Sequence, residues 1–146
     1  MHVIRNLRTG APMYQLNGPG EDLSWKDFRD ADFRGLNLVA VNFHACDITG
    51  ADFTGAILPL AKFGECVADG AKFDFAHLQS ADFAGASLLE ASFVRAVMPG
   101  ADLAWTYCEG ADFTGADVTG ANVTGSGIER ADLSPAQLAS TRGVTA

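Results

Sequence analysis

The segment ADFTGADVTGANVTG, residues 111–125, states one five-residue phrase three times, and this period restricts the possible folds more than any other feature. Counted in fives from Glu21, the phrase continues without a slip to Ser140, so residues 21–140 form 24 pentapeptides. The third residue is apolar in all 24 and is Phe in nine, while the first is Ala in 16. The second and fourth residues are mostly polar, and the fifth is often Gly.

This pattern excludes an α-helix, because a period of 3.6 residues would spread a five-residue repeat over every face. Extended backbone fits better, since the first and third residues of each phrase then point to the same side. The fifth residue breaks the alternation, so the chain must turn there, and Gly tolerates the backbone dihedrals of such a corner.

The third positions carry a longer period of 20 residues, which predicts four pentapeptides per coil and a square coil stacked on itself. With stacked strands about 4.8 Å apart, six coils would form a rod about 29 Å tall. Apolar columns would fill its interior. The candidate core residues are Phe33, Phe53, Phe73, Phe93 and Phe113 in one column and Leu38, Leu58, Leu78 and Met98 in the next, with Val118 and Leu138 continuing it.

The phrase resembles the pentapeptide-repeat family, whose consensus is a small residue, Asp or Asn, Leu or Phe, and two variable residues. The resemblance covers residues 21–140 in a single frame. It implies an all-β fold, a right-handed quadrilateral β-helix of about six coils, with the first and third positions inside. The handedness rests on the resemblance alone.

The ends of the chain depart from the phrase. Residues 1–20 predict an N-terminal cap: two short strands form a hairpin around Arg8-Thr9-Gly10, and NGPG then makes a turn. Residues 21–140 form the β-helix. Ser134 before Pro135 is a helix-start signal, so a short helix is expected to close the coil stack. Residues 141–146 are expected to be a tail.

The charge balance narrows the possible partners. With 18 acidic and 10 basic residues the net charge is −8, which argues against direct contact with nucleic acid or an anionic membrane. The first residues lack the apolar segment of a signal peptide, and no apolar run is long enough to cross a membrane. We therefore expect a cytoplasmic protein, which the family resemblance suggests is bacterial.

Residues that often carry chemistry are scattered rather than clustered. His44 and His77 fall on outward positions of different sides, without a neighbouring ligand set, and predict solvated histidines. Cys46, Cys66 and Cys108 fall on inward positions and predict small core residues. We therefore expect no cofactor, no metal site, no catalytic residue and no enzyme activity.

Departures from the consensus mark two candidate binding surfaces. Exposed apolar residues that gather on one surface favour a protein-binding role, and Trp and Tyr are frequent anchors of such contacts. The first surface, termed the apolar face, consists of Val39, Ile57, Pro59, Leu60, His77, Val97 and Pro99. The second, termed the aromatic patch, consists of Val67, Leu89, Trp105 and Tyr107. The leading hypothesis is a rigid protein-binding scaffold, such as an adaptor or an immunity protein; a homodimer is a further option.

Acidic residues offer an alternative. Outward second positions form two acidic ladders: Asp32, Asp52, Asp112 and Asp132 on one side, and Asp22, Asp82 and Asp102 on another. The resemblance implies a possible role here, because some members of the family mimic DNA and bind DNA gyrase. Lys62 and Lys72 interrupt the ladders, and Asp at this position is also the consensus. A third reading is a structural repeat protein without a strong partner.

Overall fold

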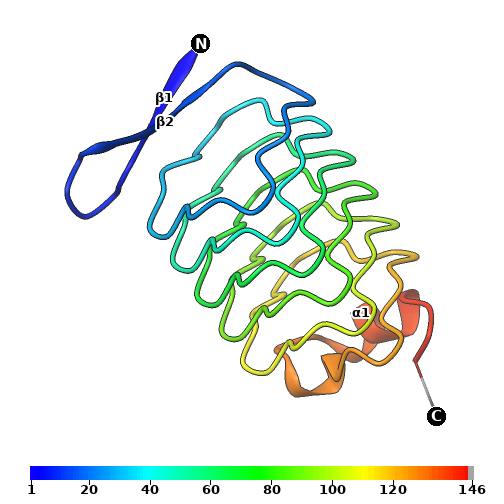
Figure 1. Cartoon of the computed structure of the whole chain (residues 1–146). Helices are drawn as coiled ribbons and strands as arrows, with labels where there is room; N and C mark the ends of the chain where they lie inside the picture. The colour runs from blue at the N-terminus through cyan, green and yellow to red at the C-terminus, as the bar shows by residue number, and fades with distance from the viewer. Residues whose placement is uncertain (145–146) are drawn as a thin grey trace.

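The computed structural model describes residues 1–144 and shows a chain wound into stacked coils, with a hairpin at one end and a short helix at the other (Figure 1). Parallel bridges join residues that are 20 apart, from Asp22 with Asn42 to Asn122 with Arg142. This register gives each coil four sides of five residues. Each side is named here after one of its core residues: the Phe33, Leu38, Phe43 and Ile48 sides.

Regular secondary structure lies only at the two ends of the described residues. It comprises β1 (His2–Arg5), β2 (Pro12–Leu16), the 3-10 helix η1 (Ile128–Arg130) and α1 (Pro135–Ser140). Along most of the stack a side contributes one bridging residue, at the second position, and then turns. The solenoid is therefore held by single parallel bridges, and its sides are too short to count as strands.

The corners share one backbone conformation. Every fifth residue from Trp25 to Gly125 has a positive φ, and eleven of these residues are not Gly, with φ between 54° and 65°. The next residue closes the turn: the Ala31 N–H donates to the Phe28 carbonyl at 3.0 Å, and the corners from Gly35 to Gly125 repeat this bond. A positive φ at the third residue of such a turn is the geometry that favours Gly.

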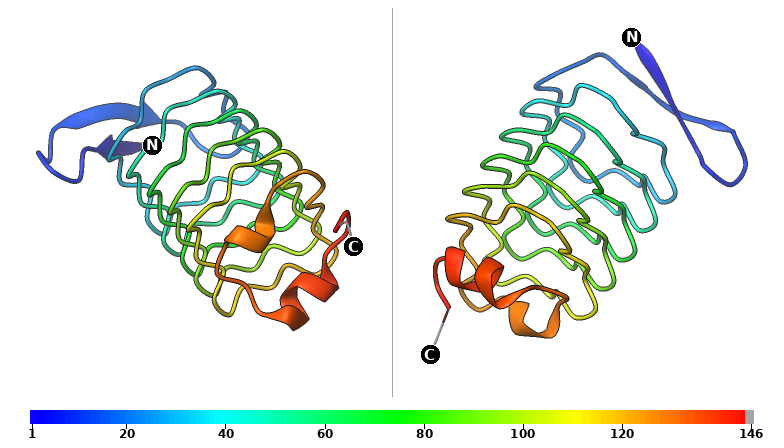
Figure 2. Two further views of the ribbon diagram at one scale, coloured as in Figure 1. Left: turned by 90° about the horizontal axis from the view of Figure 1, so that it is seen from below. Right: turned by 180° about the vertical axis from the view of Figure 1, so that it is seen from behind.

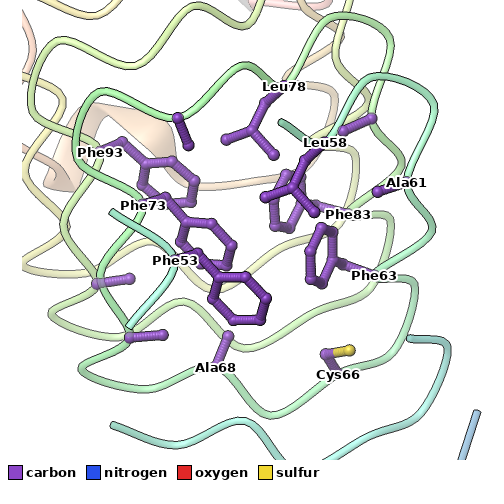
Figure 3. Packing of buried hydrophobic residues seen from close by; sticks show 14 of the residues in the cluster. Phe53, Leu58, Ala61, Phe63, Cys66, Ala68, Phe73, Leu78, Phe83 and Phe93 are labelled. Atoms are coloured by element: carbon purple, nitrogen blue, oxygen red, sulfur yellow. The ribbon is translucent and has the colours of Figure 1, made fainter. Parts of the chain in front are cut away.

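The interior is filled by two facing columns of phenylalanine rings (Figure 3). Rings of one column stack face to face, as Phe53 and Phe73 do at 4.9 Å between centroids. Rings of opposite columns meet edge to face, as Phe63 and Phe73 do at 5.4 Å. The candidate core residues are buried except Leu138, which lies in α1 and is only partly buried against the core. The facing column on the Phe43 side (Phe43, Phe63, Phe83) had not been singled out from the sequence.

The N-terminal hairpin covers one end of the stack and projects beyond it (Figure 2). β1 and β2 pair antiparallel, with His2 opposite Leu16. Ile4 and Leu16 are buried in the core cluster. The Arg5 carbonyl accepts the Asp32 N–H at 2.9 Å, which joins the hairpin to the first coil.

The last coil follows the sequence frame but not the shape of the others. η1 replaces the bridge on its Ile48 side, and α1 replaces the Leu38 side. Ser134 caps α1 and forms a capping box with Gln137, whose side-chain amide also donates to two carbonyls of the coil below. Beyond the helix Arg142 returns to register with Asn122, so the expected tail begins as a coil side. Residues 145–146 lie outside the described range.

Candidate functional site

A local hydrogen bond explains most of the polar second positions. The Asp52 carboxylate accepts the Thr54 N–H at 2.9 Å and the Thr54 hydroxyl at 2.5 Å. The Asp82 carboxylate accepts the Ala84 N–H at 2.8 Å. Such Asx turns satisfy a backbone donor at the corner that the coil-to-coil bonds do not reach. Asp and Asn at the second position therefore stabilise their own turn.

The ladder on the Phe33 side is short. Asp32 bridges to Asp52, and Asp52 then bridges to Lys72 rather than to another carboxylate. Arg34 forms an ion pair with Asp32 at 2.8 Å, which neutralises the first member. The guanidinium hydrogen bond also lowers the pKa of the Asp32 carboxyl below its usual value, despite partial burial.

The second ladder, on the Phe43 side, has the same limitation. Asn42 and Lys62 separate Asp22 from the pair formed by Asp82 and Asp102. On the Phe33 side, Lys72 and Ser92 likewise separate the pair Asp32–Asp52 from the pair Asp112–Asp132. Carboxylates thus neighbour one another in pairs, and no ladder forms an uninterrupted acidic rail.

The apolar face lies on the Leu38 side, and proline explains how it can be apolar. Pro59 and Pro99 occupy fourth positions, where other phrases place an N–H that needs an acceptor. Proline has no N–H, so the second position need not be Asp or Asn. Ile57 and Val97 stand at those two second positions. The two departures from the consensus are therefore coupled.

The residues of the apolar face lie over consecutive coils. Ile57 bridges to His77, and His77 bridges to Val97. Ile57 is 41% exposed and Leu60 58% exposed, and His77 is also exposed. The remaining members are half-buried: Val39, Pro59, Val97 and Pro99. Asp117 is the one formally charged residue among the outward positions of this side, although the chain carries a net charge of −8.

Gln79 lies at the centre of the apolar face, at the fourth position between Pro59 and Pro99. Its side-chain carbonyl oxygen is buried and accepts no hydrogen bond within the described residues. Elsewhere a fourth-position Asp reaches the next coil: Asp69 accepts the Leu89 N–H at 3.2 Å. The equivalent residue above Gln79 is Pro99, which has no N–H to donate.

The aromatic patch borders a hollow of about 350 Å³ on the Ile48 side. Trp105 and Tyr107 are each 66% exposed, and together with Leu89 they line this hollow. Val67 is exposed on the same side but lies two coils away, outside the hollow. Three charged residues also line it: Glu109, Glu129 and Arg130. The hollow exists because η1 replaces the side that would otherwise lie above Tyr107, a change that the frame of the sequence does not reveal.

Two large exposed residues of these surfaces occupy strained corners. Leu60 has a φ of 61° and Trp105 a φ of 58°, a region that costs an ordinary residue about 1 kcal/mol or more. The Trp105 ring lies over Gly125, where an added Cβ would come within 2.3 Å of the ring. Gly125 therefore makes the space into which the indole packs.

Histidines and cysteines do not form a site in the described part of the chain. Cys46, Cys66 and Cys108 are free and buried, and desolvation raises the pKa of the Cys108 thiol to about 11. His44 packs edge to face against Trp25. Residues 1–144 contain no group of three or more side chains that could hold a metal ion. Their helices are also too short, or too polar, to cross a membrane.

The family model for pentapeptide repeats matches residues 27–64, 76–107 and 91–130, in 8 copies. This chain belongs to the pentapeptide-repeat family. No curated protein matches this pentapeptide-repeat protein.

Among solved structures of other proteins, that of HetL shares the fold. HetL, involved in heterocyst differentiation regulation in the cyanobacterium Nostoc sp. strain PCC 7120, is 24% identical over 75% of this chain, with a TM-score of 0.61. The match spans only 42% of HetL. Rfr23 from the cyanobacterium Cyanothece 51142 is 18% identical over 80% of this chain and 86% of its own, with a TM-score of 0.42. QnrB1, a plasmid-mediated fluoroquinolone resistance protein, is 22% identical over 83% of this chain and 74% of its own, with a TM-score of 0.34.

Proposed function

We propose that this protein is a non-catalytic, rigid scaffold that binds another protein molecule through its apolar face. The observation that carries the proposal is the exposure of Ile57 and Leu60 on the one side that is almost free of charge. A chain with a net charge of −8 would keep its surface soluble most simply by placing Asp or Asn at these positions as well. Exposed apolar surface that gathers on one side marks a contact more often than scattered residues do.

The scaffold suits such a contact because its surface is formed before binding. Backbone hydrogen bonds join each coil to the next, and the corners close by an additional bond. A partner would therefore meet side chains whose backbone is already ordered, which lowers the entropy lost on association.

The test is an affinity capture from the source cell with three baits. These are the wild type, the Ile57→Lys/Leu60→Lys double variant, and Phe75→Lys. Phe75 is a matched control, because it is an exposed corner residue with a φ of 58° on another side. We expect a protein that binds the wild type and Phe75→Lys but not the double variant, whose circular dichroism should be unchanged. Equal capture by all three baits would overturn the proposal.

The same capture experiment would also show whether the acidic ladders, rather than the apolar face, bind the partner. A DNA mimic directed at a topoisomerase would bind DNA gyrase through Asp residues, and moderate salt would release it. Capture of gyrase by all three baits, lost at moderate salt and in an Asp82→Asn/Asp102→Asn variant, would replace the apolar face by the ladders. The separation of the carboxylates into pairs is the reason that the apolar face is preferred.

A further inference from the structure

We infer that the apolar face binds a second copy of this chain, antiparallel and side by side, with the two-fold axis crossing the face at His77 and Gln79. The inference rests on the proposed function, since it names the partner of the same face. It predicts a specific register, in which each coil of one protomer meets the coil equally far from the axis in the other.

The first support is the arrangement of residues on the Leu38 side above and below the coil that contains His77 and Gln79. Ile57 and Val97 lie one coil below and one coil above His77, and Pro59 and Pro99 lie likewise about Gln79. A two-fold interface uses the same patch twice, so it requires a surface that complements itself when reversed. In this register Ile57 meets Val97 of the second copy, and both contacts are apolar.

The second support is a match of shape at the corner of the face. Leu60 projects with 58% of its surface exposed, one coil below Ser80. Gly100 lies one coil above Ser80, and only the Ser80 hydroxyl oxygen approaches the place where its Cβ would be. Reversal of one copy sets Leu60 against Gly100 of the other, so that the largest projection meets the smallest residue.

The third support is the pattern of charge. Two chains that each carry −8 repel one another, and the Leu38 side brings the fewest charges together. Its one carboxylate, Asp117, lies two coils above His77, and Asn37 lies two coils below. The reversed register therefore sets Asp117 against Asn37 of the second copy, an acceptor against an amide donor, rather than carboxylate against carboxylate.

The fourth support is the unsatisfied amide. The Gln79 side-chain oxygen is buried without a hydrogen bond, and a buried polar atom of this kind is uncommon. The two-fold axis places Gln79 against Gln79 of the second copy. Rotation of both side chains toward the axis lets each amide donate to the other and accept from it, which satisfies the group that the monomer leaves unpaired.

The size of the apolar face indicates how tightly the two copies should bind. Five coils at about 4.8 Å give a contact about 24 Å long and one side wide, which is smaller than a standard interface. We therefore expect a dissociation constant on the order of 10 µM, measured by sedimentation from about 1 µM to about 500 µM. Added salt should strengthen the dimer, because it screens the repulsion of two acidic chains.

Single cysteines test the register directly on the purified chain. His77→Cys places a thiol beside the axis and should form a disulfide-linked dimer under mild oxidation. Lys72→Cys is the matched control, at the same position of the same coil on the Phe33 side, and should stay monomeric. The native thiols are each about 1% exposed and do not compete. Ile57→Cys should not link to itself but should link to Val97→Cys when the two are mixed.

A second test uses a variant whose substitution is compatible with the backbone conformation and should therefore not disturb folding. Leu60→Gly relaxes a positive φ and should keep the fold, yet weaken dimerisation at least tenfold. Linking of His77→Cys no faster than Lys72→Cys, or a wild type that stays monomeric to about 500 µM, would overturn the inference. If the Ile57→Lys/Leu60→Lys bait still loses a captured protein of another kind, the proposed function stands and only the identity of the partner is wrong.

Discussion

The Leu38 side and the Phe33 side follow the same backbone path and show how differently one repeat can be used. On the Phe33 side Asp52 caps the N–H of Thr54. On the Leu38 side Pro59 removes the N–H, and Ile57 takes the second position. The comparison teaches that a proline at the fourth position is one way in which the second position becomes free for an apolar residue.

The largest expected effect is on the free energy of unfolding, and it comes from the buried core residues of the two sides, which should be equally important. Phe73→Ala on the Phe33 side should lower the free energy of unfolding by about 3–5 kcal/mol, and Leu78→Ala by about 2–5 kcal/mol, because both side chains are fully buried. Phe75→Ala should change it by less than about 0.5 kcal/mol, since this corner residue is half exposed. Urea unfolding measures all three, and equal losses for Phe73 and Phe75 would show that the inside and outside positions are misassigned.

Variants at the second and fourth positions test whether the Phe33 side needs a side-chain acceptor for its fourth N–H and the Leu38 side does not. Asp52→Ala should cost about 1 kcal/mol because the Thr54 N–H loses its acceptor, while Asp52→Asn should be close to neutral. Pro59→Ala should cost about 0.4–1 kcal/mol through added freedom of the unfolded chain. Its new N–H would face Ile57, so adding Ile57→Asp should recover part of that loss. A double variant that is no more stable than Pro59→Ala would break the proposed coupling.

A smaller effect tests the corners, which both sides share. Gly55 on the Phe33 side has a φ of 69° and open space at its Cβ position, so Gly55→Ala should cost about 1 kcal/mol through backbone strain alone. Ala40 on the Leu38 side has a φ of 56°, so Ala40→Gly should gain a comparable or smaller amount. Thermal unfolding would compare the two, and effects of the same sign would contradict the shared geometry.

The smallest effect concerns pH and is tested at the ion pair of Arg34 with Asp32 on the Phe33 side. The Arg34 hydrogen bond lowers the folded-state pKa of Asp32 below the unfolded value of about 3.9. This pair therefore stabilises the fold above pH about 4, and its contribution is lost as the pH falls through the folded pKa. Arg34→Met should flatten the loss of stability below pH 4, whereas Arg95→Met, which removes a guanidinium that forms no ion pair in residues 1–144, should not.

Most of the fold could be read from the sequence because its information is local and repeated. A slip of one residue would have moved an entire apolar column outward, so the frame from Glu21 was well specified. Ser134 and Pro135 gave the start of α1 for the same reason, since a helix cap depends on adjacent residues. The hairpin cap likewise followed from two apolar segments around a turn.

The candidate binding surfaces were predicted less completely from the sequence than the fold was. Their residues could be placed on sides, but the sequence did not show that Pro59 and Pro99 release the second positions from capping. It also did not single out Gln79, whose oxygen finds no N–H at Pro99 one coil above. The hollow beside Tyr107 was missed because Gly127 keeps the frame while η1 breaks the bridge; a Gly at a second position is the signal that could have indicated it.

By itself the sequence determined the period, the four-sided coil and the inward columns, because a regular alternation of apolar and polar residues can satisfy both burial and the backbone in few ways. Only the tertiary structure decided how the two phenylalanine columns interlock and which carboxylates cap turns. It alone also decided which polar atom lies unpaired on the apolar face. The ring contacts and the unpaired oxygen involve residues 10 or 20 apart and depend on distances that appear only when the coils stack, whereas each cap joins residues only two apart.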